Sequence, residues 1–231
     1  MSQWPPYYLR RPAMPGPDVL AGFDRLLATT IETPGGEIDY RLPAPKWQFL
    51  CHLADAHALL LHGSTNPQIV LFEPRKSNDA HAFGDRRAVY AASDGIWPLY
   101  YAVLDRQRFP MSLNNACIRI AGEVPSEPHY FFSISQSALA QRPFRNGWVY
   151  LLPRASFEQQ PPLKSAGLQV EVQQWASLEA VHPIARLAVS PEDFPFLAAL
   201  RGHDDEEMFR RARADPDGFP WIDDEVGAAA G

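Results

Sequence analysis

Three polar stretches, each at the end of a segment that reads as a strand, hold the residues that can do chemistry. The first is the leucine run 59–61, followed by His62, Gly63 and Ser64. Consecutive leucines predict a strand buried on both faces, and we expect it to end at His62. Gly63 then lets another backbone or a ligand approach closely, with free main-chain groups beside the His62 donor. The alternative is that His62 is only a structural residue.

The second stretch is "VYAAS", in which Tyr90 ends a strand and small residues lead into a helix that carries Tyr101. Tyrosine rings offer flat faces to an aromatic ligand, although both are equally consistent with half-buried core residues. The third stretch is "QQWAS", residues 173–177, followed by "VHPIARL", residues 181–187. Here polar side chains precede a short link and a last strand.

In this order the three stretches resemble the ADP-ribosyltransferase family, in the His-Tyr-Glu branch that includes poly-ADP-ribose polymerases and diphtheria-type toxins. That branch has a strand ending in His-Gly-Ser or His-Gly-Thr, matched here at residues 62–64. It then has a strand ending in Tyr and a helix with another Tyr, matched by Tyr90 and Tyr101. Its third motif is a Glu followed by an aromatic residue, and Gln174 holds the position of the Glu. The resemblance covers about residues 59–190.

The resemblance implies that NAD lies across the split of two small sheets. His62 would then bind the adenosine ribose, the Gly63 backbone would hold the carboxamide, and Tyr90 and Tyr101 would enclose the nicotinamide ring. Loop 75–87 would lie over the cleft and select the acceptor. It implies catalytic roles for His62, Tyr90 and Gln174, and NAD binding by His62, Gly63, Ser64, Tyr90 and Tyr101.

Two departures from the family pattern bear on activity. Gln174 is neutral and cannot offset positive charge at the ribosyl centre. Compared with a glutamate at this position, we expect the reaction to be about a hundred- to a thousandfold slower. Pro98 replaces the helix serine that commonly contacts nicotinamide, and Ser93 is nearby but differently placed. Glu171 is an alternative acid, but in one continuous strand over 168–176 it would face away from Gln174.

We therefore expect an NAD-binding, ADP-ribosyltransferase-like protein that, if active, transfers one ADP-ribose group to an acceptor, such as a protein, that the sequence does not identify. The alternative is a non-catalytic module. It would bind a nucleotide without turnover, or contact a protein partner through its Pro-rich N-terminal arm and C-terminal helix.

Composition excludes several other functions. The chain has 231 residues, 46% of them hydrophobic, and a net charge of −6 without a basic cluster, so we expect no extended nucleic-acid surface. No apolar run approaches the length of a membrane span and no signal peptide is evident, so we expect a cytoplasmic protein of bacterial type. His52 and His57 are five positions apart, which misses the spacing of a helical metal pair, and we predict no metal site.

Short strands that do not alternate regularly with helices predict an α+β fold. The resemblance implies that its strands form a split pair of small, mainly antiparallel sheets. Helices are expected over 18–30, 46–58, 93–106, 191–200 and 204–215. Strands are expected over 37–43, 59–62, 67–74, 87–93, 116–122, 129–135, 147–153, 168–176 and 184–190. We divide the chain into an irregular arm (1–17), one α+β domain (18–215) and an irregular tail (216–231).

Overall fold

The computed structural model describes residues 5, 7–32, 35–77, 79, 81–165 and 168–222. Its helices are α1 (Pro17–Ile31), α2 (Lys46–His57), α3 (Trp97–Val103), α4 (Gln136–Leu139) and α5 (Asp205–Ala214), with 3-10 turns at Pro191–Asp193 and Leu197–Ala199. One sheet contains β1 (Leu9–Arg10), β6 (Leu113–Ile120), β7 (His129–Ser135), β10 (Leu163–Ser165), β11 (Leu168–Val172) and β14 (Arg201–His203). The other contains β2 (Gly36–Glu37), β3 (Leu60–Ser64), β4 (Arg75–Lys76), β5 (Arg87–Ala92), β8 (Gly147–Leu152), β9 (Glu158–Gln159), β12 (Gln174–Ser177) and β13 (Ala185–Val189).

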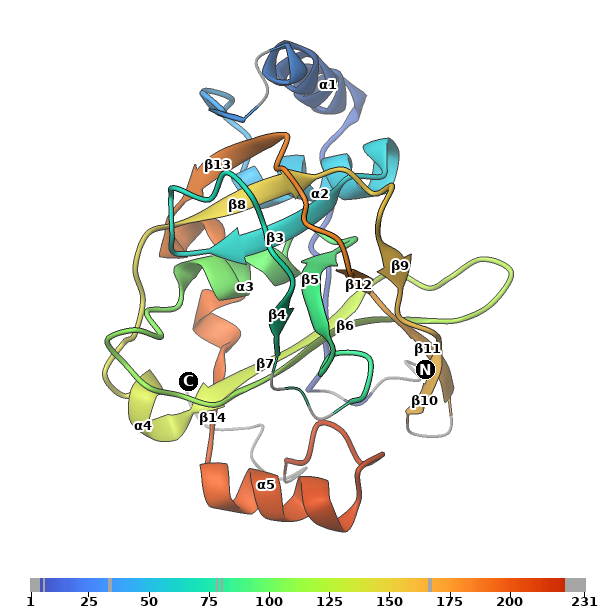
Figure 1. Ribbon diagram of the computed structural model, residues 1–231, viewed down its shortest axis with the longest axis vertical. Helices are drawn as coiled ribbons and strands as arrows, with labels where there is room; N and C mark the ends of the chain where they lie inside the picture. The colour runs from blue at the N-terminus through green and yellow to red at the C-terminus, as the bar shows by residue number, and fades with distance from the viewer. Residues whose placement is uncertain are drawn as a thin grey trace.

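Both sheets are mainly antiparallel, which confirms the α+β class (Figure 1). The six-stranded sheet has the order β1-β7-β6-β11-β10, with β14 also paired to β7. The eight-stranded sheet has the order β2-β13-β8-β3-β5-β12-β9, with β4 also paired to β5. The predicted helices α1, α2 and α5 form close to the expected bounds. In α1 and α2 the apolar residues repeat with the helical period, whereas α5 has acidic residues in its first turn and basic residues in its last turn, which suits the helix dipole.

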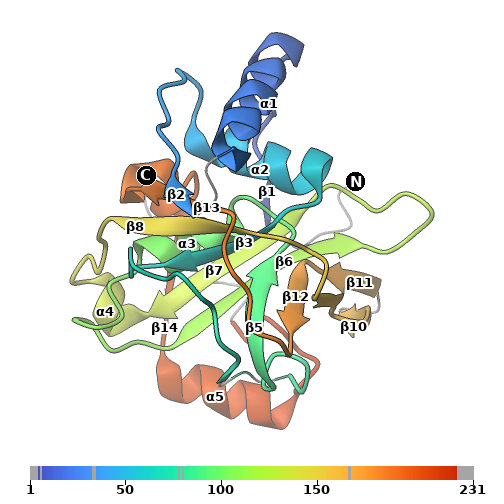
Figure 2. The same ribbon diagram turned by 45° about the horizontal axis from the view of Figure 1, so that its top comes forward.

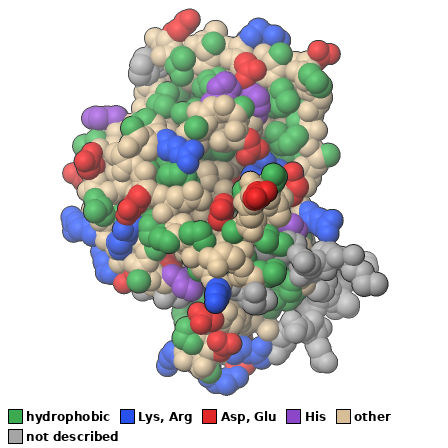
Figure 3. Space-filling view, turned by 90° about the vertical axis from the view of Figure 1, so that its right-hand side faces the viewer, with side chains coloured by type: hydrophobic (Ala, Val, Ile, Leu, Met, Phe, Trp, Pro, Cys, Tyr) green, Lys and Arg blue, Asp and Glu red, His purple; other side chains and the backbone are tan. Residues whose placement is uncertain are grey.

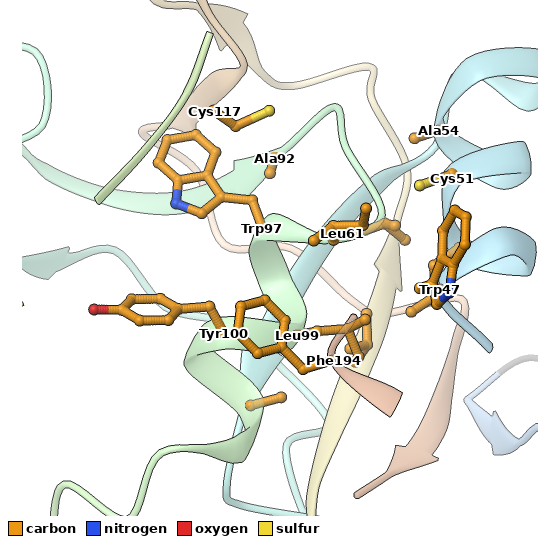
Figure 4. Packing of buried hydrophobic residues seen from close by; sticks show 14 of the residues in the cluster. Trp47, Cys51, Ala54, Leu61, Ala92, Trp97, Leu99, Tyr100, Cys117 and Phe194 are labelled. Atoms are coloured by element: carbon orange, nitrogen blue, oxygen red, sulfur yellow. The ribbon is translucent and has the colours of Figure 1, made fainter. Parts of the chain in front are cut away.

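Helix α3 lies between the two sheets and forms the centre of the core. Its residues Trp97, Leu99 and Tyr100 are buried together with Leu61 of β3 and with α2 residues such as Cys51 (Figure 4). The Tyr100 hydroxyl donates to the Ser133 carbonyl of β7 at 2.8 Å, which attaches the helix to the six-stranded sheet. Every residue of α3 except Tyr101 is buried.

A buried carboxylate fixes where α3 begins. Asp94, with no exposed surface, accepts the backbone N–H groups of Ile96 and Trp97 at 2.8 Å each. Its other oxygen pairs with the Arg11 guanidinium at 2.8 Å and accepts the Tyr130 hydroxyl at 2.7 Å. One side chain thus joins the N-terminal arm, the six-stranded sheet and the start of the helix.

Several predicted boundaries were wrong. The arm over 1–17 is not wholly irregular, because Leu9–Arg10 pairs with β7 and Arg11 reaches the core. The helix predicted over 93–106 ends at Val103, since Leu104 forms a bridge with Phe144. Residues 67–74 contribute one bridge, from Phe72 to Val181, in place of a strand. The described part of the expected tail, 216–222, has no helix or strand, as predicted, and its remainder, 223–231, lies outside the described residues.

The predictions for 37–43, 168–176 and 191–200 also need correction. Only Gly36–Glu37 forms a strand in the first segment. The second divides at Gln173 into β11 and β12, which belong to different sheets. The third forms the two 3-10 turns, because Pro195, in the interior of the segment, interrupts an α-helical ladder.

The surface shows both signs of charge. On the face drawn in Figure 3, acidic and basic side chains are interspersed without a large field of one sign. Among the described residues, no helix has the length and apolar character needed to cross a bilayer.

We predict that Asp94→Ala strongly destabilises the fold, because it leaves the buried Arg11 with only the partly exposed Asp55 as a carboxylate partner and removes the first hydrogen bonds of α3. Breaking a buried pair in this way costs about 3–5 kcal/mol. Urea unfolding measures the loss. Asp39→Ala, which removes an ion pair between exposed side chains, is the control and should change stability little. A loss below about 1 kcal/mol at Asp94 would contradict the assigned role.

Candidate functional site

The eight-stranded sheet splits between β3 and β5. These strands share a single register pair, Leu61 with Ala92, whereas β3 pairs with β8 over its whole length. Beyond that pair the strands diverge steeply (Figures 1 and 2). On the far side of β5, β12 pairs Gln174 with Ala92. The three motif-bearing strands therefore lie side by side in the order β3-β5-β12.

His62 bridges the split. Its Nδ1 lies 2.7 Å from the carbonyl oxygen of Tyr90 on the opposite strand. A carbonyl only accepts, so Nδ1 carries the proton and Nε2 remains an acceptor in the neutral ring. Burial lowers the pKa of His62, against a smaller opposite effect of this hydrogen bond, which favours the neutral form. The imidazole also contacts the Phe72 ring at a centroid distance of 4.7 Å.

The predicted end of the strand at His62 was wrong. β3 continues through Gly63 and Ser64, which stand opposite Val149 and Trp148 of β8. The close approach expected at Gly63 does occur, but the neighbour is α3: a Cβ at Gly63 would lie 1.9 Å from the Pro98 carbonyl oxygen. Of the two expected neighbours, another backbone or a ligand, the described structure has the backbone, and this glycine has a packing role.

The main-chain groups of Gly63 nevertheless face the split. The Leu151 carbonyl of β8 accepts the Ile184 N–H, so Leu151 turns its polar groups toward β13. Hydrogen-bonded and non-bonded pairs alternate along an antiparallel ladder. Leu61, opposite Leu151, therefore directs its N–H and C=O toward β5, and so does Gly63 two residues later. β5 offers Gly63 no register partner.

Tyr90 and Gln174 share one face of the sheet. Alternation places Tyr90 on the same face as Ala92, which packs in the α3 core, and Gln174 pairs directly with Ala92. Gln174 is therefore a diagonal neighbour of Tyr90, about 7–8 Å away in such ladders. His62 is on the opposite face, with Leu60. The predicted residues thus gather at the split but approach it from both sides of the sheet.

The Tyr90 hydroxyl holds the loop that follows β4. It lies 2.9 Å from the Phe83 carbonyl and accepts the Arg86 N–H at 2.9 Å. Burial raises the pKa of Tyr90, as does the negative charge of Asp79 in the same loop. The described part of loop 75–87 therefore lies against the tyrosine, and the phenol is bound by that loop.

Tyr101 belongs to a polar group that sequence reasoning missed. Its hydroxyl donates to Asn115 Oδ1 at 2.8 Å, and Trp97 Nε1 donates to the same oxygen at 2.6 Å. Burial raises the pKa of Tyr101 to about 12, and the charge of Asp79 adds to this effect. Asp79 thus lies within electrostatic reach of both candidate tyrosines. Asn115, in the middle of β6, carries no motif that would have indicated it.

The other candidate side chains have structural partners. Ser93 donates to Gln173 Oε1 at 3.0 Å, and the Gln173 N–H reaches the Cys117 carbonyl, which joins the two sheets. Ser64 Oγ accepts the Asn66 N–H in a turn. Glu171 is in the other sheet, opposite Arg119. The argument from strand parity was wrong because the strand breaks, although Glu171 is indeed separate from Gln174.

No family model, curated protein or solved structure matches this chain. The functional argument therefore depends on the site itself. On the α3 face, the described side chains that gather at the split are neutral hydrogen-bonding groups and aromatic rings, with Asp79 the nearby carboxylate. Such a surface suits a flat ligand with an amide or hydroxyl groups.

We predict that His62 makes folding stability depend on pH. Its folded-state pKa is below the unfolded value of about 6.5, so only the unfolded chain takes up its proton as the pH falls. Stability from His62 is therefore present above about pH 6.5 and declines below it, by at most about 1.4 kcal/mol per pH unit.

Urea unfolding between neutral and mildly acidic pH checks this expectation, with His62→Gln compared to wild type. Burial also lowers the pKa of His129 and His203, so the decisive quantity is the difference between the two pH slopes. His182→Gln, at an exposed histidine, should retain the wild-type slope. Equal slopes for wild type and His62→Gln would contradict the neutral, buried imidazole.

Proposed function

We propose that this chain binds NAD at the split between β3 and β5 and acts as an ADP-ribosyltransferase-like protein. The observation that carries the proposal is the adjacency of β3, β5 and β12, with His62, Gly63, Tyr90 and Gln174 at the one point where the sheet opens. The resemblance to the family requires this adjacency of the three motif-bearing strands, and it supports the proposal for that reason.

Each group then has a role in binding. The Gly63 N–H and C=O, directed at the split, pair with the nicotinamide carboxamide, and the rings of Tyr90 and Tyr101 enclose the nicotinamide. Nε2 of His62 accepts a ribose hydroxyl. The loop held by Tyr90 and Arg86 covers the site and contacts the acceptor.

In the transfer reaction, the bond between nicotinamide and ribose breaks and its electron pair leaves with nicotinamide. An acceptor nucleophile then attacks the cationic ribosyl carbon and loses its proton to solvent. Gln174 can accept a hydrogen bond from the ribose 2′-hydroxyl, but it supplies no negative charge. Slow transfer of a single ADP-ribose group follows, or NAD binding without turnover.

The structure weakens one argument for the alternative, a protein-interaction module. It used the N-terminal arm as a free contact surface, but Leu9–Arg10 is paired with β7 and the Arg11 side chain is only 5% exposed. Nucleotide binding without turnover remains the second candidate, favoured by the amide at position 174.

We predict that NAD raises the stability of the protein. At a concentration a hundredfold above the dissociation constant, a ligand specific for the folded state contributes about 2.7 kcal/mol. Thermal unfolding with and without NAD measures this, and His62→Ala should lose most of the effect. Exposed His182→Ala is the matched control. If NAD, nicotinamide and ADP-ribose all leave the midpoint of thermal unfolding unchanged, the proposal is wrong.

A second prediction concerns the missing acid. Gln174→Glu should increase the rate of nicotinamide release from NAD by about a hundred- to a thousandfold, because it supplies the electrostatic stabilisation that glutamine lacks. Gln169→Glu, at an exposed position of β11, adds the same charge away from the split and should leave the rate unchanged. Equal rates for the two variants would remove Gln174 from the site.

A further inference from the structure

A second cluster of chemically capable side chains joins helices α1 and α2. Asp24 of α1 has one carboxylate oxygen, Oδ1, that lies 2.6 Å from His52 Nε2 and 2.8 Å from His57 Nε2. The ligand atoms of all three residues lie within 4.8 Å of one another. Histidine side chains, purple in Figure 3, adjoin one another in the upper part of that face, at the level of these helices.

We propose that Asp24, His52 and His57 form a binding site for a divalent transition-metal ion of the zinc type. Two imidazole nitrogens and a carboxylate are a recurrent ligand set for zinc with an open fourth position. Imidazole ligands favour Zn²⁺, Co²⁺, Ni²⁺ and Cu²⁺ over Mg²⁺ and Ca²⁺, which prefer all-oxygen sites.

The geometry needs only a small adjustment. Tetrahedral Zn²⁺ at about 2.0–2.1 Å from each ligand separates the ligand atoms by roughly 3.3 Å. The two hydrogen-bonded separations must therefore lengthen by about half an ångström, which side-chain rotation can supply. The Asp24 and His57 side chains are 51% and 34% exposed and can move, whereas His52 is 11% exposed and packs against Phe23.

Helix packing overcomes the unfavourable spacing of the two histidines. His57 is the last residue of α2, and the chain turns at Ala58 in the left-handed conformation, with φ 51°. Asp24 stands between the two rings because Phe23, its neighbour, packs edge-on against Phe49 of α2 at 5.5 Å. The third ligand thus comes from a helix far away in sequence, where no pattern of spacing reveals it.

Metal binding replaces the present hydrogen bonds. Each imidazole would bind the ion through Nε2 and carry its remaining proton on Nδ1, and Asp24 Oδ1 would complete a three-residue set. Water takes the fourth position on the exposed side. Cys51 and Cys117 do not compete, since both are buried and burial raises the pKa of both thiols.

The bound ion would link α1 to α2 by coordination bonds. Among the residues of α1, only Phe23 and Leu27 are buried, and the helix stands at the outer edge of the molecule (Figure 2). A coordination link between the helices would therefore strengthen the attachment of a helix that has only two buried residues.

The test titrates tag-free protein, freed of metal, with Zn²⁺ by calorimetry and with Co²⁺ by visible absorption. We expect one ion per chain and the visible bands of four-coordinate Co²⁺. His57→Gln and Asp24→Asn should each weaken Zn²⁺ binding at least about tenfold to a hundredfold. His81→Gln and His182→Gln, at histidines outside the cluster, should bind as wild type does.

The competing explanation is that Asp24 only accepts two hydrogen bonds and holds the helices together. In that case Asp24→Asn would lower the thermal midpoint equally with and without Zn²⁺. If metal binds, Zn²⁺ raises the midpoint of wild type and not that of His57→Gln. The proposal is overturned if Zn²⁺ does not bind at micromolar concentrations, or if the cluster variants bind it as tightly as wild type. Neither result bears on NAD binding.

Discussion

The fold depends on one buried carboxylate. Asp94 caps α3, neutralises Arg11 of the N-terminal arm and accepts the Tyr130 hydroxyl, all without exposure to solvent. Burying a charged carboxylate costs folding free energy unless its oxygens accept hydrogen bonds or pair with a cation, and here each oxygen has two such partners. Since α3 fills the space between the sheets, the position of this carboxylate also determines where α3 packs against β3 and β8.

The fixed position of α3 limits the space beside the split between β3 and β5. Gly63 and Gly147 allow the α3 backbone to approach their strands so closely that a Cβ at either would meet a carbonyl oxygen at 1.9 Å. The helix therefore cannot withdraw or tilt without losing this contact. A ligand bound at the split, as we propose, would meet fixed groups, namely the Gly63 main chain, Tyr101 with Asn115, and the Tyr90 ring under its loop. The adjustable part is the loop.

Periodicity predicted the long elements well, since α1, α2 and β7 contain complete amphipathic or buried repeats. It also predicted three strands that prove to be neighbours. Periodicity did not predict that His62 and Tyr90 lie on opposite faces of the sheet, because that depends on the register of β3 against β5, in which Leu61 pairs with Ala92. It treated 168–176 as one strand, since a change of sheet at Gln173 leaves no mark on hydrophobicity. Asn115 and the meeting of Asp24 with His52 depend on tertiary packing, which no local pattern encodes.

The position of the N-terminal arm has a consequence for folding. Leu9 pairs with Tyr130, and Arg11 binds partners 83 and 119 positions away. During synthesis, Leu9 must therefore wait until β7 has left the ribosome before it can pair, whereas the partners Asp55 and Asp94 of Arg11 are made earlier. Contacts of such long range carry a high entropic cost of loop closure and slow the search for the native state. The pairing of the arm with the six-stranded sheet is therefore completed only after β7 has formed.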